Sequence, residues 1–493
     1  MKPNILYIMS DDHAANSISC YGSILSKVYK TPNTDRLYNE GCRMDDFFST
    51  NSICTPARAT VMTGQYGQVS GVKTLSDNWE PCGSPNIAKI FKDGGYQTAM
   101  FGKWHLGCEP VGFEEYCYLS NGRDKGGEQG RYINPVFMKK GEGLIEKEGY
   151  VTDIITDMAT NWIENRDKDK PFFMMCHHKA PHDWWIYADR HKDMFEGVEI
   201  PEPDSLFEDR AHRCEVARHT GTTVTPRGFH RSLYEAFSSP DYPVEPLLGM
   251  ENCTYEEKGR AAYQKYLKDY LRTTAAIDDS VGELLETLEN QGILDDTIII
   301  YTSDQGMYLG EHDHQDKRWS YEEGLRSPFL IRYPKEIKAK TNITELMANI
   351  DVAPTLLDYA GLEIPSEMQG QSCRKLITGE EKELNDYIYF RYWMHLAHHF
   401  NPAHYGVRTK EYKLIFYYAM PLDASGAVDK EMKPGWELYD LEKDPFELKN
   451  VYDEPEYAQI KKDMIEKLNE AKIKFKDEDL QYELLRRTHK ESQ

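Results

Sequence analysis

The chain of 493 residues lacks the features that mark several common protein classes. No stretch approaches the roughly 18 consecutive apolar residues of a membrane-spanning helix, so no membrane span is expected. The ten cysteines include no C-x-x-C pair and form no dense framework, and most are expected to be small buried side chains. Positive charge is scarce, because 59 lysines and arginines face 82 aspartates and glutamates, a net charge of −23. This balance argues against nucleic acid or an anionic membrane as the partner.

The start of the sequence also lacks the pattern of a secretion signal. The apolar run Ile5–Met9 is too short for the hydrophobic part of a signal, and Asp11 and Asp12 follow where small residues would be expected at a cleavage site. With Met1 taken as the native start, we expect a cytoplasmic protein. The composition, 40% hydrophobic and 29% charged, is typical of a soluble globular protein, and it leaves a homo-oligomer open.

What the chain does contain is an alternation of strand-like and helix-like segments. This alternation predicts an α/β fold with a mixed, mostly parallel sheet flanked by helices on both faces. The expected strands are Asn4–Ser10, Met44–Ser49, Gln97–Phe101, Pro171–His177 and Thr297–Ser303. The expected helices are Asn33–Asn39, Pro56–Met62, Pro85–Lys92, Val151–Asn165 and Tyr255–Asn290.

Two changes of pattern suggest how the chain is divided. Residues 200–255 are polar and rich in proline, histidine and arginine, and are interpreted as a surface insertion near a site. After about residue 380, short antiparallel strands (Tyr387–Trp393, Tyr405–Thr409, Leu414–Tyr418) precede the helix Glu454–Lys474. We therefore expect an N-terminal catalytic domain over residues 1–380 and a smaller C-terminal α+β domain, with an antiparallel sheet, over residues 381–493.

Carboxylates follow two of the expected strands directly. Asp11 and Asp12 come after the first strand, and Asp304 and Gln305 come after the very apolar strand Thr297–Ser303. Open parallel sheets bind ligands at the carboxyl ends of their strands. Three carboxylates and an amide oxygen would make a hard oxygen site, suited to Ca²⁺ or Mg²⁺. The simpler alternative is that each pair only caps a helix or a turn.

A cysteine and an arginine are expected to share one helix face. Pro56 suits the first turn of a helix, which places Cys54 at its N-terminus, where the dipole favours anions and lowers a thiol pKa. Arg58, four residues later, lies on the same face. The pattern indicates a reactive side chain beside an anion-binding guanidinium; the alternative is a buried cysteine and a surface arginine.

Further polar residues follow other strands. Lys103 and His105, two residues apart after the strand Gln97–Phe101, would point the same way in extended backbone. His182 follows the strand Pro171–His177, and a lone histidine there is more often structural. Lys317 and Arg318 lie downstream of Asp304 and could complete an anion clamp or simply belong to a solvated loop.

Taken together, these motifs resemble the sulfatase family, the formylglycine-dependent type I enzymes of the alkaline-phosphatase superfamily. The resemblance covers nearly the whole chain. The motifs that carry it are residues 4–12 (NILYIMSDD), 54–60 (CTPARAT) with 63–64, 102–107 (GKWHLG), 180–182 (APH), 303–318 and 436–441 (WELYDL) with 444–447. One departure is Gln305, where many members carry asparagine or histidine.

The resemblance implies an alkaline-phosphatase-like fold and a role for each matching residue. Cys54 would be oxidised by a formylglycine-generating maturation enzyme, and one hydroxyl of the aldehyde hydrate would attack sulfur while the other later expels sulfate. Arg58 would steady the hydrate, Lys103, His182 and Lys317 would hold sulfate oxygens, and His105 would deprotonate the hydrate. His182 is also our choice for the general acid. A divalent cation, usually Ca²⁺ in this family, would be bound by Asp11, Asp12, Cys54, Asp304 and Gln305.

The substrate is less sharply indicated. Histidines and aromatics could hold a sugar, and the candidates are Trp184, Trp185, His312, His395, His398 and His404. The alternative is a histidine-rich loop with aromatics packed between the domains. We expect a small-molecule sulfate ester, a sulfated saccharide such as a glucosamine 6-sulfate type, or an aryl or steroid sulfate. The competing functions are a phosphonate or phosphodiester hydrolase of the same superfamily and a non-catalytic binder of sulfated glycans in which Cys54 is never modified.

Overall fold

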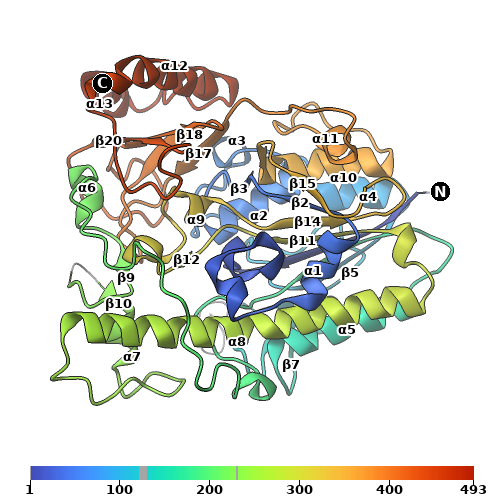
Figure 1. The fold of residues 1–493 in the computed structure, drawn as a ribbon. Coiled ribbons are helices and arrows are strands. Elements are labelled where there is room, and N and C mark those ends of the chain that lie inside the picture. The colour runs from blue at the N-terminus through green and yellow to red at the C-terminus, as the bar shows by residue number, and fades with distance from the viewer. Residues whose placement is uncertain (1, 121–129, 229–230) are drawn as a thin grey trace.

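A computed structural model describes residues 2–120, 130–228 and 231–493 of the chain. Its centre is a ten-stranded mixed sheet (Figure 1). The pairs within the block β11–β1–β8–β4–β5 are all parallel, whereas β14 and the β6–β7 hairpin are antiparallel additions. In sheet order the strands are β15 (Thr341–Ile343), β2 (Cys42–Met44), β14 (Phe329–Arg332), β11 (Thr297–Ser303), β1 (Asn4–Ser10), β8 (Phe172–His177), β4 (Gln97–Gly102), β5 (Glu115–Leu119), β6 (Val136–Lys139) and β7 (Gly143–Glu146).

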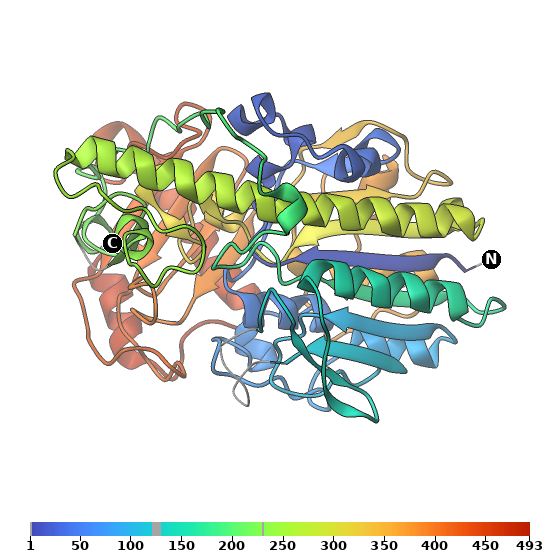
Figure 2. The same ribbon diagram turned by 90° about the horizontal axis from the view of Figure 1, so that it is seen from below.

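Helices cover both faces of this sheet, which explains why its central strands are apolar without interruption. The long helix α8 (Tyr255–Asn290) runs beside α5 (Val151–Asn165) across one face (Figure 2). The same face also carries α1 (Pro32–Asn39). The opposite face carries α2 (Cys54–Thr63), α3 (Gly67–Ser70), α4 (Ile87–Asp93), α10 (Val352–Ala360) and α11 (Arg374–Thr378). The predicted α/β architecture is confirmed.

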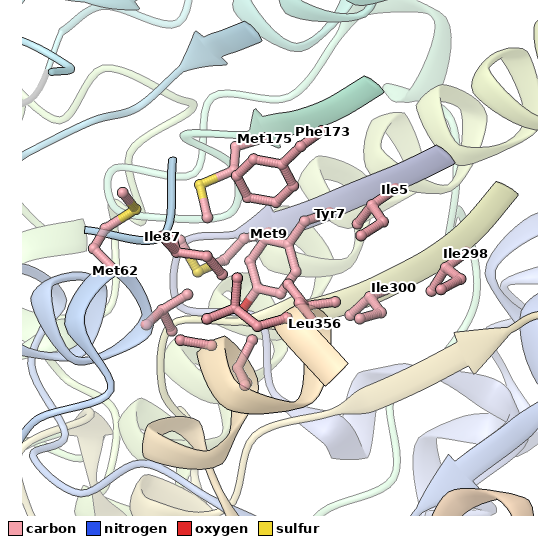
Figure 3. Packing of buried hydrophobic residues seen from close by; sticks show 14 of the residues in the cluster. Ile5, Tyr7, Met9, Met62, Ile87, Phe173, Met175, Ile298, Ile300 and Leu356 are labelled. Atoms are coloured by element: carbon pink, nitrogen blue, oxygen red, sulfur yellow. The ribbon is translucent and has the colours of Figure 1, made fainter. Parts of the chain in front are cut away.

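The two cores follow from the two-residue period of a strand. Along β1, Ile5, Tyr7 and Met9 point to one face and pack with residues of β8, β11, α10, α4 and α2 (Figure 3). Leu6 and Ile8 point to the other face, against α5 and α8. Since both sets are fully buried, the strand is clamped between two layers, and its carboxyl end is held firmly where the polar residues begin.

A second layer of structure forms the C-terminal region. Its four antiparallel strands are β17 (Ile388–Tyr392), β18 (His404–Arg408), β19 (Tyr412–Tyr417) and β20 (Gly435–Asp440), covered by α12 (Ala458–Lys474) and α13 (Glu483–Glu491) (Figure 1). The last strand coincides with the WELYDL motif and was not anticipated as a strand. The predicted antiparallel sheet and helix are confirmed, while the boundary at residue 380 stays a prediction.

Two expectations about local structure need revision. The expected strand Met44–Ser49 is divided, since β2 ends at Met44 and β3 (Phe47–Phe48) pairs separately with β16 (Met347–Ala348). The segment 200–255 is more deeply packed than its polarity suggested. Its Arg213 is buried and forms an ion pair with the half-buried Glu208, which also binds the buried His312. Charges can be buried in this way because they are paired.

Short elements complete the chain. They are α6 (Glu215–Arg218), β9 (Thr222–Thr223), β10 (Arg231–Ser232), α7 (Leu233–Phe237), β12 (Tyr308–Leu309), β13 (Gln315–Asp316) and α9 (Glu322–Leu325).

None of the described helices combines the length and the apolar character needed to cross a bilayer.

Candidate active site

The polar residues gather at one edge of the sheet, where β1 and β11 end side by side. Their register pairs Ser10 with Ser303, so the residues that follow each strand are neighbours. Asp11, Asp12 and Asp304 are buried, and they offer carboxylate oxygens that lie within 4.8 Å of one another. Three buried carboxylates this close repel strongly unless cations stand between them.

This acidic group has the donors that a hard cation needs. Gln305 donates from Nε2 to Asp12 Oδ1 at 2.5 Å, while its carbonyl Oε1 is buried without a hydrogen-bond partner among the described residues. A buried carbonyl oxygen left unpaired is costly, and a bound ion would satisfy it. The residues present therefore fit a divalent cation with oxygen ligands.

Cys54 lies at the first position of α2, as the sequence predicted, and faces this group. Its Sγ lies 3.3 Å from Asp11 Oδ1. The expectation of an acidic thiol is wrong. Burial, and then the charge of Asp11, raises the pKa of the Cys54 thiol far above its ordinary value. An unmodified Cys54 would thus be a protonated thiol and a poor nucleophile.

Arg58 lies one turn further along α2 and is buried, so the alternative of a surface arginine is excluded. Its Nε and Nη2 lie 3.0 and 2.9 Å from Asp304 Oδ2, and Nη2 is 3.8 Å from Asp11. Nη1 donates to the carbonyl of Lys103 at 2.7 Å. The guanidinium therefore joins α2 to the ends of three strands.

Two lysines neutralise the remaining carboxylates. Lys103, just after β4, bonds Asp11, and Lys317 Nζ donates to Asp12 Oδ2 at 2.6 Å. Burial would raise the pKa of Asp11, but Lys103, His182 and Arg58 outweigh it and hold that pKa well below its usual range. Both ammonium groups thus place positive charge near Cys54, where an anionic substrate group can meet it.

Two histidines complete the site. Burial, and then the nearby Lys103 ammonium, lowers the pKa of His105 well below its ordinary value, so its ring is neutral. Its Nδ1 is buried and without a hydrogen-bond partner in the described ranges. His182, in the loop after β8, places Nε2 3.7 Å from Asp12 Oδ2. The neutral ring of His105 can accept a proton, which is what a general base requires.

Four of the six expected sugar contacts are buried and have partners within the protein, and they stay predictions as substrate contacts. Trp185 packs in the core beside Tyr266, and His312 binds Glu208. His395 accepts from the amide of Ala403, and His404 bonds Ser320. The buried residues are Trp185, His312, His395 and His404.

The other two expected contacts, Trp184 and His398, lie near the surface. Trp184 lies two residues after His182. Its ring packs edge-on against Tyr242, and the guanidinium of Arg231 lies over the ring. His398 is exposed. Both stay predictions as substrate contacts.

A further set of residues lies beside Lys317, and of these the sequence had indicated only Arg318, as part of an anion clamp. Asp316 forms a two-point ion pair with Arg318 at 3.2 and 3.1 Å, and it lies 3.7 Å from His399 Nε2. Thr222 of the 200–255 segment lies 3.0 Å from His399 Nδ1. Asp316 and Arg318 flank Lys317 in the sequence, so their proximity was readable. Nothing in the sequence distinguished His399 from its neighbours.

Comparisons with known proteins agree with this geometry. A family model described as sulfatase matches residues 3–362, and a model described as the C-terminal part of N-sulphoglucosamine sulphohydrolase matches residues 310–474. The chain is 39% identical to an N-acetylglucosamine-6-O-sulfatase of Bacteroides thetaiotaomicron, over 97% of this chain and 88% of that protein.

Solved structures are similar as well. One, determined in complex with its substrate D-glucosamine-2-N,6-O-disulfate, superposes with a TM-score of 0.86 at 37% identity, over 98% of this chain and 100% of that one. A phosphonate monoester hydrolase of Agrobacterium radiobacter has a TM-score of 0.70 at 21% identity, over 98% of this chain and 97% of that one, which shows a shared fold alone.

Proposed function

The chain belongs to the sulfatase family of the alkaline-phosphatase superfamily and is a sulfuric ester hydrolase, and we propose that its substrate is a saccharide carrying a 6-sulfate on glucosamine. One observation carries this proposal. Asp11, Asp12, Asp304, Lys103 and Lys317 converge on Cys54 in a chain that is 39% identical, nearly end to end, to a named N-acetylglucosamine-6-O-sulfatase.

We propose two groups that the polypeptide acquires after synthesis. Oxidation of Cys54 to formylglycine by a maturation enzyme would supply a hydrated aldehyde, whose two hydroxyls allow both attack and release. A divalent cation held by Asp11, Asp12, Asp304, Gln305 and residue 54 would offset negative charge on the sulfuryl group. We infer Ca²⁺ rather than Mg²⁺, because Mg²⁺ is usually bound through one or two carboxylates and keeps several waters, whereas three carboxylates meet here.

Each polar residue of the site has a separate role in the proposed reaction. Lys103 and Lys317 bind sulfate oxygens, because both ammonium groups lie beside the carboxylates at the strand ends and act on residue 54 with their charge. Arg58 holds residue 54 in place from the same helix. His182 donates a proton to the leaving oxygen, and neutral His105 accepts one at residue 54.

Recognition of the sugar is assigned to a group of residues beside Lys317. Asp316, Arg318 and His399 present an acceptor, a planar donor and a ring that can do either, which together can bind neighbouring hydroxyls. Their placement beside Lys317 puts this hydrogen-bonding group one residue from a sulfate-binding ammonium. Trp184, two residues after His182, offers an apolar ring near the same loop.

A substrate panel tests the proposal. We expect glucosamine 6-sulfate and its N-acetyl form to have the largest kcat/KM, ahead of 3-sulfated and galactose-type sugars, estrone sulfate and p-nitrophenyl sulfate, read as released inorganic sulfate. A phosphodiester in the same panel is expected to react more slowly than any sulfate ester. Faster hydrolysis of the phosphodiester, or of the steroid sulfate, would contradict the proposal.

Two histidines provide a matched test of sugar recognition. His399→Ala should lower kcat/KM for N-acetylglucosamine 6-sulfate about tenfold, the effect of one or two hydrogen bonds. Hydrolysis of p-nitrophenyl sulfate, which has no sugar hydroxyls, should be unchanged. His191→Ala, at a histidine that pairs with Asp279 of α8 and is not among the candidate sugar contacts, should leave both substrates unaffected. An equal loss for both substrates in His399→Ala would place this residue in the chemistry instead.

The cytoplasmic location and the homo-oligomer stay predictions.

A further inference from the structure

The two ring nitrogens of His182 face different partners. Nδ1 lies 2.6 Å from Asp183 Oδ1 and 3.1 Å from the carbonyl oxygen of Asp183. Nε2 points into the site and lies 3.7 Å from Asp12 Oδ2. Both partners at Nδ1 are acceptors, so this nitrogen carries a proton whatever the state of the other nitrogen.

The segment that supplies these acceptors is itself anchored. The carbonyl of His182 accepts a hydrogen bond from Tyr132 Oη at 2.5 Å, and the amide of His182 donates to the carbonyl of Lys179 at 3.1 Å. Lys179 is buried, its ammonium lies 4.7 Å from the centre of the Tyr132 ring, and it donates to the carbonyl of Asp183 at 3.5 Å. Three hydrogen bonds outside the catalytic group thus hold the backbone of this segment, two at His182 and one at Asp183.

We propose that Asp183 is a positioning residue, whose carboxylate accepts the Nδ1–H of His182 and so turns Nε2 with its proton toward the leaving oxygen of the sulfate ester. This inference rests on the proposed function and on His182 as the general acid. As the sulfur–oxygen bond breaks, the electron pair of that bond goes to the sugar oxygen, which takes the Nε2 proton. The ring is left neutral with its remaining proton on Nδ1, still bonded to Asp183.

A role in positioning makes a specific kinetic prediction. Protonation helps only a basic leaving oxygen, so loss of a well-placed acid should be felt more as the leaving group becomes more basic. Asp183→Ala should lower kcat about 10- to 100-fold for N-acetylglucosamine 6-sulfate, with KM within about twofold, and change p-nitrophenyl sulfate by less than about threefold. Across a series of substituted phenyl sulfates, the rate should fall more steeply with the basicity of the phenol than in the wild type.

A double-mutant cycle then shows whether Asp183 acts through His182. His182→Ala should give the same steepening, with a loss of about 10² to 10⁴ for the sugar sulfate. Adding Asp183→Ala to His182→Ala should change the rates less than about twofold, because the residue it positions is already absent. Asp183→Asn, whose amide oxygen can still accept from Nδ1, should recover part of the activity. Asp189→Ala, an exposed aspartate of the following segment, is the matched control and should match the wild type.

The outcomes are distinct. A uniform loss for all leaving groups in Asp183→Ala, or the same loss with and without His182, would overturn the inference and indicate a substrate contact or a structural role. Wild-type rates in Asp183→Ala would overturn it as well. Failure of the wild-type enzyme to hydrolyse any sugar sulfate would instead overturn the proposed function, and the inference with it. Thermal unfolding of each variant at the wild-type temperature confirms that the fold is intact.

Discussion

Cys54→Ala is expected to lower kcat for every sulfate ester by about 10⁵-fold or more, the scale on which removal of a nucleophile acts in other hydrolases. Alanine has no side chain that maturation can oxidise, so neither the attacking hydroxyl nor the hydroxyl that releases sulfate can form. The fold should survive, because Cys54 contacts Asp11 rather than the apolar core. The measurement is single-turnover and steady-state release of sulfate, with thermal unfolding recorded in parallel.

A second buried cysteine provides the control. Cys42→Ala removes a fully buried thiol from β2, inside the main core and away from the carboxylates. It should reduce stability by about 1 kcal/mol, the scale of a small core truncation, and leave kcat unchanged. Peptide mass spectrometry should find residue 54 of active wild-type enzyme about 18 Da lighter than cysteine, a shift set by covalent chemistry. Full activity in Cys54→Ala, or an ordinary thiol in fully active wild-type enzyme, would refute the role of Cys54.

Asp304→Asn is expected to lower activity by the second largest amount, because it changes both the cation site and the environment of Arg58. The substitution keeps the shape of the side chain but replaces one of the three carboxyl groups formed by Asp11, Asp12 and Asp304 with a neutral amide. Loss of a carboxylate ligand should weaken Ca²⁺ binding and lower kcat/KM by about 10²-fold or more. It also leaves the buried Arg58 without its closest carboxylate.

Metal binding can be read independently of turnover. A ligand at 100 times its Kd stabilises the folded state by about 2.7 kcal/mol, so Ca²⁺ should raise the Tm of chelator-treated wild-type protein measurably. This rise should be absent or much smaller in Asp304→Asn. Asp296→Asn, just before the opposite end of β11 and paired with exposed Lys335, should keep the full rise. Equal Ca²⁺-dependent shifts in both variants would exclude Asp304 as a ligand.

The sequence predicted the positions of the site residues better than it predicted their charge states. Asp11, Asp12 and Asp304 could be located because each follows an apolar strand, and parallel strands bring their carboxyl ends together. Cys54 and Arg58 could be placed on one face because a helix repeats every 3.6 residues. These inferences rest on local periodicity, which a single sequence records. The charge state of Cys54 was misjudged, because burial beside Asp11 is a property of the assembled site.

The sequence by itself thus determined the α/β architecture, the positions of the catalytic motifs at strand ends, and the residues that meet around Cys54. Only the tertiary structure decided which of the several histidines are buried and which partner each of them contacts. It buried His395 and His404, brought His399 to Asp316, and aligned Asp183 with His182. The physical reason is that these distinctions depend on how loops from different parts of the chain pack together, and loop packing leaves no periodic signal in the chain.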